Sequence, residues 1–450
     1  MKKLFVALLV LSLFSTVSYS EPTIYKNKSG VMEKMLYEKF WIRRANNPDK
    51  ILMTKEQINE LSNKIKKSKA TACVDIFSYS EIITKEKLVN LINTFKFSKE
   101  ARYNGDTLID SEYIVNLKKQ RNEKALSSYN IVRFGTVIRE TQIRAFPTSD
   151  AAYTEPNDVE FDMNIESVLK VWEPLAFLHT SLNGEWELVQ SSTCLGWVRT
   201  EDTAITNKTR LRKLLERDFI TVTANRITTD VDHSNPSLSP ITLTMGTYLP
   251  LADKVDTISD ITTQYSYSVI LPERDSDGNL VEKISRIPFN ADVQHGYLPY
   301  TQKNIIKQAF KLLGERYGWG GLWNARDCSS FVKDIYSTFG IQLPRNSANQ
   351  ARIPSLHFDV SDLNAKDKTS LIMEQPVGAL LRKKGHIMLY LGHYNRKPYV
   401  IHNAYSYGES GKNGQYERMK INSVVISDLE ITLKDKTLFI DSIIDINTIN

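Results

Sequence analysis

The alternation of hydrophobic and polar residues divides this chain into three regions. Residues 21–125 are mostly polar, and their few apolar residues recur at helical spacing, as in the helix predicted after Thr54, where Thr-Lys-Glu-Gln forms a capping box. Residues 126–298 are short runs rich in β-branched and aromatic residues, separated by turn residues, as strands are. Residues 299–450 show helical spacing first and strand patterns afterwards. The chain therefore predicts an α+β protein whose sparse N-terminal helices pack against the rest.

The strand-rich region divides into two blocks, 126–215 and 216–298. In the first block the turn Asn183-Gly184 precedes a strand that begins at Trp186, and Gly196-Trp197-Val198 follows. This order suggests a small barrel and resembles bacterial SH3-type domains. The second block looks like a more divergent barrel of the same type. Either barrel could be a structural spacer, bind the cell wall or form part of a substrate site.

The last region is predicted to begin with two helices. The first covers residues 304–313, and the second follows Cys328, carries apolar residues at helical spacing and stops at Gly340. After a polar stretch at 355–369 that we expect to be irregular, three strands follow. They are expected at 377–381, 386–391 and 399–404.

Cys328 lies where the second of these helices begins. Asp327 can cap the helix, and the unpaired N–H groups and positive dipole end of its first turn favour a thiolate. A cysteine in an apolar helix is usually a packing residue, but Cys328 precedes the apolar stripe. These features predict a nucleophile, which needs a base within hydrogen-bond reach.

Two histidines on neighbouring predicted strands are the candidates for that base. His386 begins one strand and His402 lies on the next, so antiparallel pairing could bring the two imidazoles together. One ring would then act as the base and the other would orient it. Alternatively, either histidine is structural. A zinc site that includes His393 is conceivable, but the spacing matches no common ligand pattern; His393 is expected to be solvated and His357 to lie at the surface.

The composition is that of a globular protein of several domains. The 450 residues are 41% hydrophobic and 24% charged, a length that suits roughly three or four domains. The net charge of +6 is spread thinly, which suits work near an anionic surface and does not indicate a nucleic-acid partner.

The first twenty residues have the pattern of a secretory signal peptide. Lys2 and Lys3 precede the apolar run 4–14, and cleavage is expected after Ser20. An uncleaved anchor is the alternative, but the run is too short for a bilayer span, and no other stretch approaches one. The protein is thus expected to be exported, to the periplasm or the medium, with no membrane segment after cleavage. Three cysteines are too few for a disulfide-rich scaffold, although Cys73 and Cys194 could pair.

Residues 304–404 resemble the NlpC/P60 family of cysteine peptidases. The resemblance depends on several short motifs in a fixed order, and the layout of a helical segment, two SH3-type barrels and this domain resembles multi-domain wall-peptide endopeptidases of that family. The motifs are Tyr317-Gly318-Trp319-Gly320-Gly321, Asp327-Cys328-Ser329-Ser330-Phe331, Leu343-Pro344-Arg345-Asn346-Ser347, Gly385-His386-Ile387, Tyr390-Leu391-Gly392 and Ile401-His402.

This resemblance implies a papain-like fold and hydrolysis of peptidoglycan stem peptides between γ-D-glutamate and the diamino acid, without a metal or cofactor. By matching position Cys328 is the nucleophile, His386 the base and His402 the orienting residue of a Cys-His-His triad. Asp327, Ser329 and Trp319 are the expected substrate contacts, and Arg345 is either a site residue or a structural ion-pair partner. In family members with a preceding barrel, that barrel can favour peptides with a free N-terminal L-alanine.

These expectations divide the chain into five parts and leave two rival functions open. One rival is an amidase or acyltransferase of the same fold, and the other is a non-catalytic wall-binding protein. The partners are expected to be peptidoglycan stem peptides or their fragments, and the protein is expected to be a monomer. The five parts are the signal peptide 1–20, the helical segment 21–125, barrel one at 126–215, barrel two at 216–298 and the NlpC/P60 catalytic domain 299–450.

Overall fold

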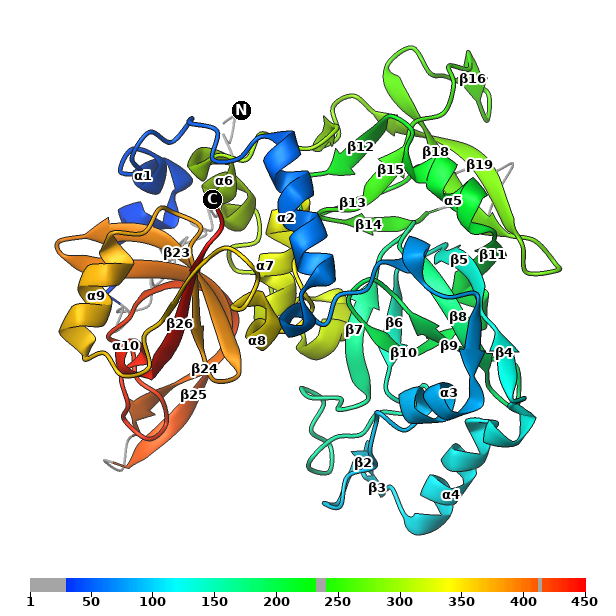
Figure 1. The fold of residues 1–450 in the computed structure, drawn as a ribbon. Helices are drawn as coiled ribbons and strands as arrows, with labels where there is room; N and C mark the ends of the chain where they lie inside the picture. The colour runs from blue at the N-terminus through cyan, green and yellow to red at the C-terminus, as the bar shows by residue number, and fades with distance from the viewer. Residues whose placement is uncertain (1–29, 232–239, 412–414) are drawn as a thin grey trace, which may run out of the picture.

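The computed structural model describes residues 30–231, 240–411 and 415–450, so the expected leader lies outside the described residues. In Figure 1 the C-terminal sheet and its helices lie on one side, and the strand-rich regions lie on the other. The N-terminal segment, in blue, runs along both parts. The observed order of helices followed by an antiparallel sheet in the last region confirms the predicted α+β class.

The first strand-rich block forms one antiparallel sheet of seven strands in the order β11-β5-β8-β9-β10-β6-β7. Its centre is packed with apolar side chains from most of these strands, including Leu175, Phe177 and Val189. The strands are β5 (Arg133–Val137), β6 (Thr141–Arg144), β7 (Ile165–Leu169), β8 (Pro174–Thr180), β9 (Trp186–Gln190), β10 (Leu195–Arg199) and β11 (Thr203–Thr206).

The second block packs around a core that it shares with the first block, including Trp172 and Ala204. Its described residues, 216–231 and 240–298, divide their strands among four small sheets. Helix α5 (Lys208–Leu215) connects the two blocks. A second SH3-type barrel therefore stays a prediction. The strands are β12 (Phe219–Val222), β13 (Arg226–Thr228), β14 (Thr242–Thr244), β15 (Tyr248–Pro250), β16 (Thr257–Ile258), β17 (Ile261–Thr262), β18 (Ser266–Arg274), β19 (Leu280–Pro288) and β20 (Val293–His295).

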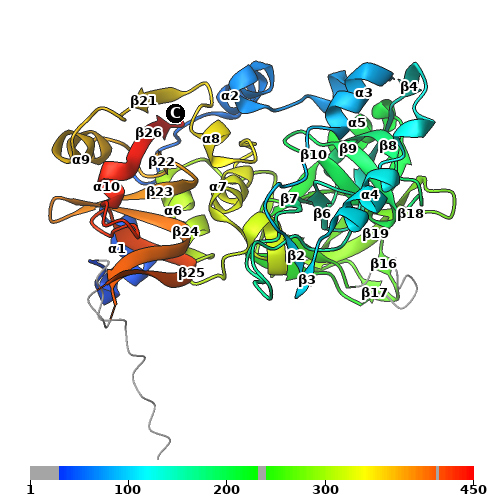
Figure 2. The same cartoon turned by 90° about the horizontal axis from the view of Figure 1, so that it is seen from below.

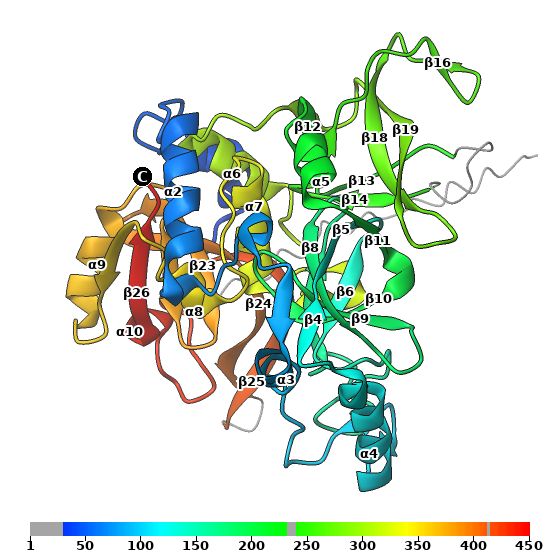
Figure 3. The ribbon, with the colours of Figure 1, turned by 45° about the vertical axis from the view of Figure 1, so that its right-hand side comes forward.

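The N-terminal segment packs against both neighbours. Helices α1 (Glu38–Ile42) and α2 (Lys55–Lys67) join the core of the C-terminal domain, while α3 (Lys85–Ile92) joins a core shared with the first barrel. The segment is not purely helical, because β1 (Ile82–Thr84) pairs with β4 (Tyr129–Ile131), and β2 (Tyr103–Asn104) pairs with β3 (Thr107–Leu108). Figures 2 and 3 show α4 (Ser111–Gln120) beside the barrel and α2 beside the C-terminal helices.

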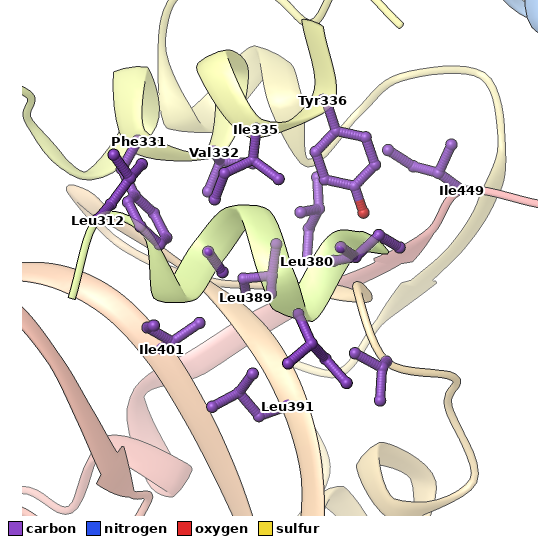
Figure 4. Close-up of a cluster of buried hydrophobic side chains, with 14 of the residues drawn as sticks. Leu312, Phe331, Val332, Ile335, Tyr336, Leu380, Leu389, Leu391, Ile401 and Ile449 are labelled. Atoms are coloured by element: carbon purple, nitrogen blue, oxygen red, sulfur yellow. The ribbon is translucent and has the colours of Figure 1, made fainter. Parts of the chain in front are cut away.

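The C-terminal domain has a six-stranded antiparallel sheet in the order β21-β26-β22-β23-β24-β25. Helix α7 (Cys328–Ser337) packs its apolar face, including Phe331, Val332 and Ile335, against one side of this sheet (Figure 4). The other elements are α6 (Gln302–Phe310), α8 (Ser347–Gln350), β21 (Leu356–Asp359), α9 (Ala365–Met373), β22 (Leu380–Lys383), β23 (His386–Tyr394), β24 (Lys397–Ser410), β25 (Tyr416–Asp428), α10 (Phe439–Ser442) and β26 (Ile443–Thr448).

One expectation for this domain is wrong. The stretch 355–369 is not irregular, because it contains β21 and the start of α9. Strand β21 pairs with β26 at the far C-terminal end of the chain, and His357 in it contacts Asp445 at 2.9 Å. Pairing with a strand almost ninety residues away supplies the order that local sequence does not show.

Candidate active site

Cys328 is the first residue of α7, as its sequence setting predicts. The carboxylate of Asp327 accepts from the backbone N–H groups of Ser329 and Ser330, at 3.1 and 2.8 Å, and so caps the helix. The hydroxyl of Ser330 accepts from the N–H of Asp327 at 2.8 Å, which completes a capping box. The nucleophile candidate therefore stands at a helix start that a capping box holds in place.

The two predicted histidines lie side by side on β23 and β24. Nε2 of His386 is 2.8 Å from Nδ1 of His402, and the two rings meet at 67°. The sulfur of Cys328 interacts with the backbone N–H of Ile387, the residue after His386. Because His402 occupies Nε2 of His386, Nδ1 is the nitrogen left for the sulfur. The structure thus brings all three predicted residues into one region.

A fourth polar residue, Ser427 on β25, contacts the far side of His402. Its hydroxyl lies 3.1 Å from Nε2 of His402, and both residues are almost completely buried. No motif in the sequence singles out Ser427. Its role depends on the register of β24 and β25, in which Val400 faces Ser427 and His402 faces Val425.

The charge state of this site differs from the expected thiolate. Burial raises the pKa of the Cys328 thiol to about 12, and the charge of Asp327 acts in the same direction. The N–H groups of Ile387 and Ser329 and the charge of Arg345 favour the thiolate but are outweighed. Burial also lowers the pKa of His386 well below its usual 6.5 and that of His402 to about 3. These shifts favour a thiol and two neutral imidazoles in the resting site.

Arg345 is an ion-pair partner of Asp327. Its guanidinium donates to both carboxylate oxygens, at 2.6 and 3.3 Å, and to the hydroxyl of Ser329 at 2.8 Å. Burial by itself raises the pKa of Asp327, but the charge and hydrogen bonds of Arg345 outweigh it and the net shift is downward. Asp327 and Ser329, predicted as substrate contacts, are buried and already hydrogen-bonded to this arginine.

Trp319 belongs to a group of aromatic rings where the barrel meets the C-terminal domain. The ring of Phe161, from the loop before β7, lies 5.4 Å from Trp319 and 4.6 Å from Tyr405. The neighbouring Glu160 accepts from Arg316 at 3.2 Å and from Asn422 at 3.2 Å. A loop of the barrel is thereby attached beside the residues that precede the nucleophile. No motif in the sequence singles out Phe161 or Glu160.

Two glycines of the predicted motif allow the barrel to approach this closely. Gly320 and Gly321 have φ of +63° and +106°, in the region that favours glycine. A Cβ on Gly320 would lie 2.7 Å from a side-chain carbon of Ile165, and one on Gly321 would lie 2.0 Å from a side-chain carbon of Val168. Strand β7 also supplies Ser167, whose hydroxyl accepts from Arg345 at 2.7 Å.

A buried charge network joins the same parts behind the site. Asp334 of α7 accepts from Lys170 of the barrel at 2.6 Å and from Arg326 at 2.8 Å, and Arg326 also pairs with Glu315 at 2.8 Å. Because breaking a buried ion pair is costly, these contacts hold the barrel and the C-terminal domain in one orientation.

The other cysteines and His393 can be located among the described residues, which also bear on the possibilities of a metal site and a membrane span. Cys73 and Cys194 are free thiols, and His393 is exposed with Nδ1 3.4 Å from the Tyr390 hydroxyl. Residues 30–231, 240–411 and 415–450 contain no group of three metal-ligating side chains that could hold an ion. The same residues form no helix long and apolar enough to cross a bilayer.

Comparison with known proteins identifies two regions of the chain. Residues 314–430 match the model of the NlpC/P60 family, and residues 151–199 match the SH3 domain of SH3b1 type. The chain therefore carries an NlpC/P60 domain, of a family that generally comprises cysteine peptidases and hydrolases acting on peptidoglycan, and one SH3b-type domain.

Individual proteins that are similar to this chain include a curated relative and a solved structure. A gamma-D-glutamyl-L-lysine dipeptidyl-peptidase of Bacillus subtilis (strain 168) is 31% identical over 93 residues, which are 20% of this chain and 30% of that relative. The match thus spans less than a third of the relative's length. An NlpC/P60 endopeptidase from Photobacterium damselae subsp. piscicida has a similar fold, with a TM-score of 0.74 and 19% identity over 91% of this chain and 96% of that one.

Proposed function

We propose that this protein is a cysteine endopeptidase that hydrolyses the bond between γ-D-glutamate and the diamino acid of peptidoglycan stem peptides. The observation that carries the proposal is the 2.8 Å contact between His386 and His402 beside the buried Cys328, inside an NlpC/P60 domain. The Bacillus relative, whose name specifies γ-D-glutamyl-L-lysine, supports the choice of bond.

In the proposed mechanism Cys328 attacks as its proton leaves. Because burial favours the neutral pair, Nδ1 of His386 takes the thiol proton while the sulfur bonds to the γ-carbonyl carbon. Nδ1 of His402 accepts the Nε2–H of His386 and stabilises the imidazolium that forms. The backbone N–H of Cys328, at the start of α7, is the expected donor to the oxyanion.

In the remaining steps His386 passes its proton to the leaving groups. His386 gives its proton to the leaving amine, the C–N bond breaks, and a thioester to Cys328 remains. Water then adds to the thioester while His386 takes its proton. The C–S bond breaks, His386 returns that proton to the departing sulfur of Cys328, and the acid is released. The substrates are wall peptides, which fits a family that acts on the cell wall; we propose that the protein is exported and works as a monomer.

Incubation of purified protein with L-Ala-γ-D-Glu-diaminopimelate, followed by mass spectrometry, tests the proposal. Cys328→Ala should abolish release of L-Ala-γ-D-Glu with the fold retained. Cys73→Ala, which removes another free thiol far along the chain, is the matched control and should keep full activity. An unchanged rate for Cys328→Ala, or products cut at another bond, would refute the assignment.

A further inference from the structure

Lys383 lies directly beside the proposed base. It ends β22 and pairs with His386 across the turn formed by Lys384 and Gly385. Residues that pair across an antiparallel ladder present their side chains on the same face, so Lys383 and His386 share one. The Lys383 ammonium lies 5.2 Å from the ring centre of Phe439, and the His386 ring lies 6.4 Å from the same ring. Phe439 therefore supports both side chains.

The ammonium of Lys383 has no close counter-ion. It is half-buried, and no carboxylate of the described residues makes an ion pair with it. The charge of Asp435 attracts it only from a greater distance. Burial lowers the pKa of Lys383, whereas the charge that Cys328 carries when ionised and the charge of Asp435 act in the opposite sense. A partly desolvated cation without a partner is costly, and an anion that binds beside it offsets that cost.

The position of Lys383 indicates which half of the substrate it would meet. In the proposed reaction His386 protonates the leaving amine, so the turn that carries His386 borders the leaving residue. The acyl half lies instead towards Cys328 and the start of α7. A cation on this turn would therefore contact the leaving diamino acid.

We propose that Lys383 binds a carboxylate of the leaving diamino acid residue, an inference that rests on the proposed function. Two carboxylates of such a residue could serve. One is the α-carboxylate of a leaving residue at the peptide's C-terminus, which diaminopimelate and lysine both have. The other is the second carboxylate of a diamino dicarboxylic acid, which lysine lacks.

Four forms of L-Ala-γ-D-Glu-diaminopimelate test the proposal: both leaving-residue carboxylates free, either one amidated, and both amidated. Lys383→Met keeps the alkyl packing on Phe439 and removes the charge. It should lower kcat/KM about tenfold through KM on the fully free peptide and have no effect on the doubly amidated one. Lys383→Arg should recover most of the loss. Lys384→Met, an exposed neighbour on the same turn, is the matched control and should behave as wild type.

The singly amidated peptides identify the source. The carboxylate whose amidation removes the sensitivity to Lys383→Met is the one bound. An equal loss on all four peptides, or no loss on any, would overturn the proposal, because Lys383 would then act on the Cys328 thiol or not at all. A wild-type protein that cleaves none of the four peptides would instead overturn the proposed function and this inference with it.

Discussion

The hydroxyl of Ser427 lies 3.1 Å from Nε2 of His402, on the opposite side of the ring from His386. This contact decides which nitrogen of His402 carries its proton. For Nδ1 to accept from His386, the proton of neutral His402 must be on Nε2, where Ser427 is its acceptor. Since His402 is completely buried, no bulk water replaces that acceptor.

Ser427→Ala should therefore slow the reaction without weakening substrate binding. The unsatisfied Nε2–H of His402 costs about 1–3 kcal/mol, which favours the other tautomer of this ring. In that tautomer the Nδ1–H of His402 faces the Nε2–H of His386, so Nδ1 cannot accept from it. We expect kcat to fall roughly tenfold or more with KM unchanged. Nitrogen NMR of the histidine ring should show the tautomer change directly.

Two matched variants separate positioning from packing. Ser427→Thr keeps the hydroxyl and should restore much of the rate. Ser423→Ala, on the same strand, should leave kcat as in wild type. A Ser427→Ala enzyme with wild-type kcat and an unchanged tautomer would contradict the role assigned to this serine.

The pH dependence should reflect neutral histidines. Because burial holds the pKa of His386 well below 6.5, the acid limb of kcat/KM should lie below pH 6.5, with no loss from histidine protonation between pH 8 and 6.5. Recording the pH–rate profile of the wild type checks this. His393→Gln changes only an exposed histidine and should give the same profile; a half-maximal rate at or above pH 6.5 would contradict the expectation.

The same two groups affect stability in acid. Below pH 6.5 the unfolded chain protonates histidines that the folded chain keeps neutral, so the free energy of unfolding falls as the pH decreases towards the lowered folded pKa values. Above pH 6.5 the two histidines contribute no pH dependence. Thermal unfolding of wild type and His402→Asn at pH 8 and pH 5 measures the difference, which should be smaller in the variant.

Replacement of Arg345 should destabilise the fold through Asp327. Arg345→Met leaves the Asp327 carboxylate buried without its cation, which costs about 3–5 kcal/mol. Asp327→Asn keeps a side chain that can cap α7, so the double variant should recover part of this loss. Ser167→Ala, which removes only one partner of Arg345, should cost about 1 kcal/mol. Urea unfolding of the four variants gives the values, and additive single effects would contradict a coupled pair.

Gly321→Ala should loosen the contact between the barrel and the C-terminal domain. The new methyl group would lie 2.0 Å from Val168 at a φ of +106°. Gly184→Ala, at a turn with φ of +75° and nothing within 4 Å, is the control for backbone strain alone. Hydrogen exchange should increase in β7 and around residues 319–324 only in the first variant. Equal protection in both variants would mean that the close approach is not needed for docking.

Much of this architecture was readable in the sequence because it depends on local patterns. The apolar stripe after Cys328 predicts α7, and Asp327 predicts its cap, since helical spacing and capping are short-range properties. His386 and His402 lie on consecutive strands of a short hairpin, where antiparallel pairing was the natural expectation. Their close contact is found.

Other features could not be read locally. Strand β21 forms because it pairs with β26. The cation that pairs with Asp327 is Arg345, which lies beyond the end of α7 in the chain. The expected thiolate rested on the helix start alone. Burial of the thiol, together with the charge of Asp327, reverses that preference, and burial is a property of the packed molecule.

The sequence by itself determined the class of the protein, the order of its elements and the identity of the three residues proposed for chemistry, because motifs and periodicity are written along the chain. Only the tertiary structure decided what surrounds them: Ser427 behind His402, Lys383 beside His386, and the barrel against Gly320 and Gly321. These contacts join residues from separate strands and domains. Strand register and domain packing set them, and neither is encoded in any short stretch of sequence.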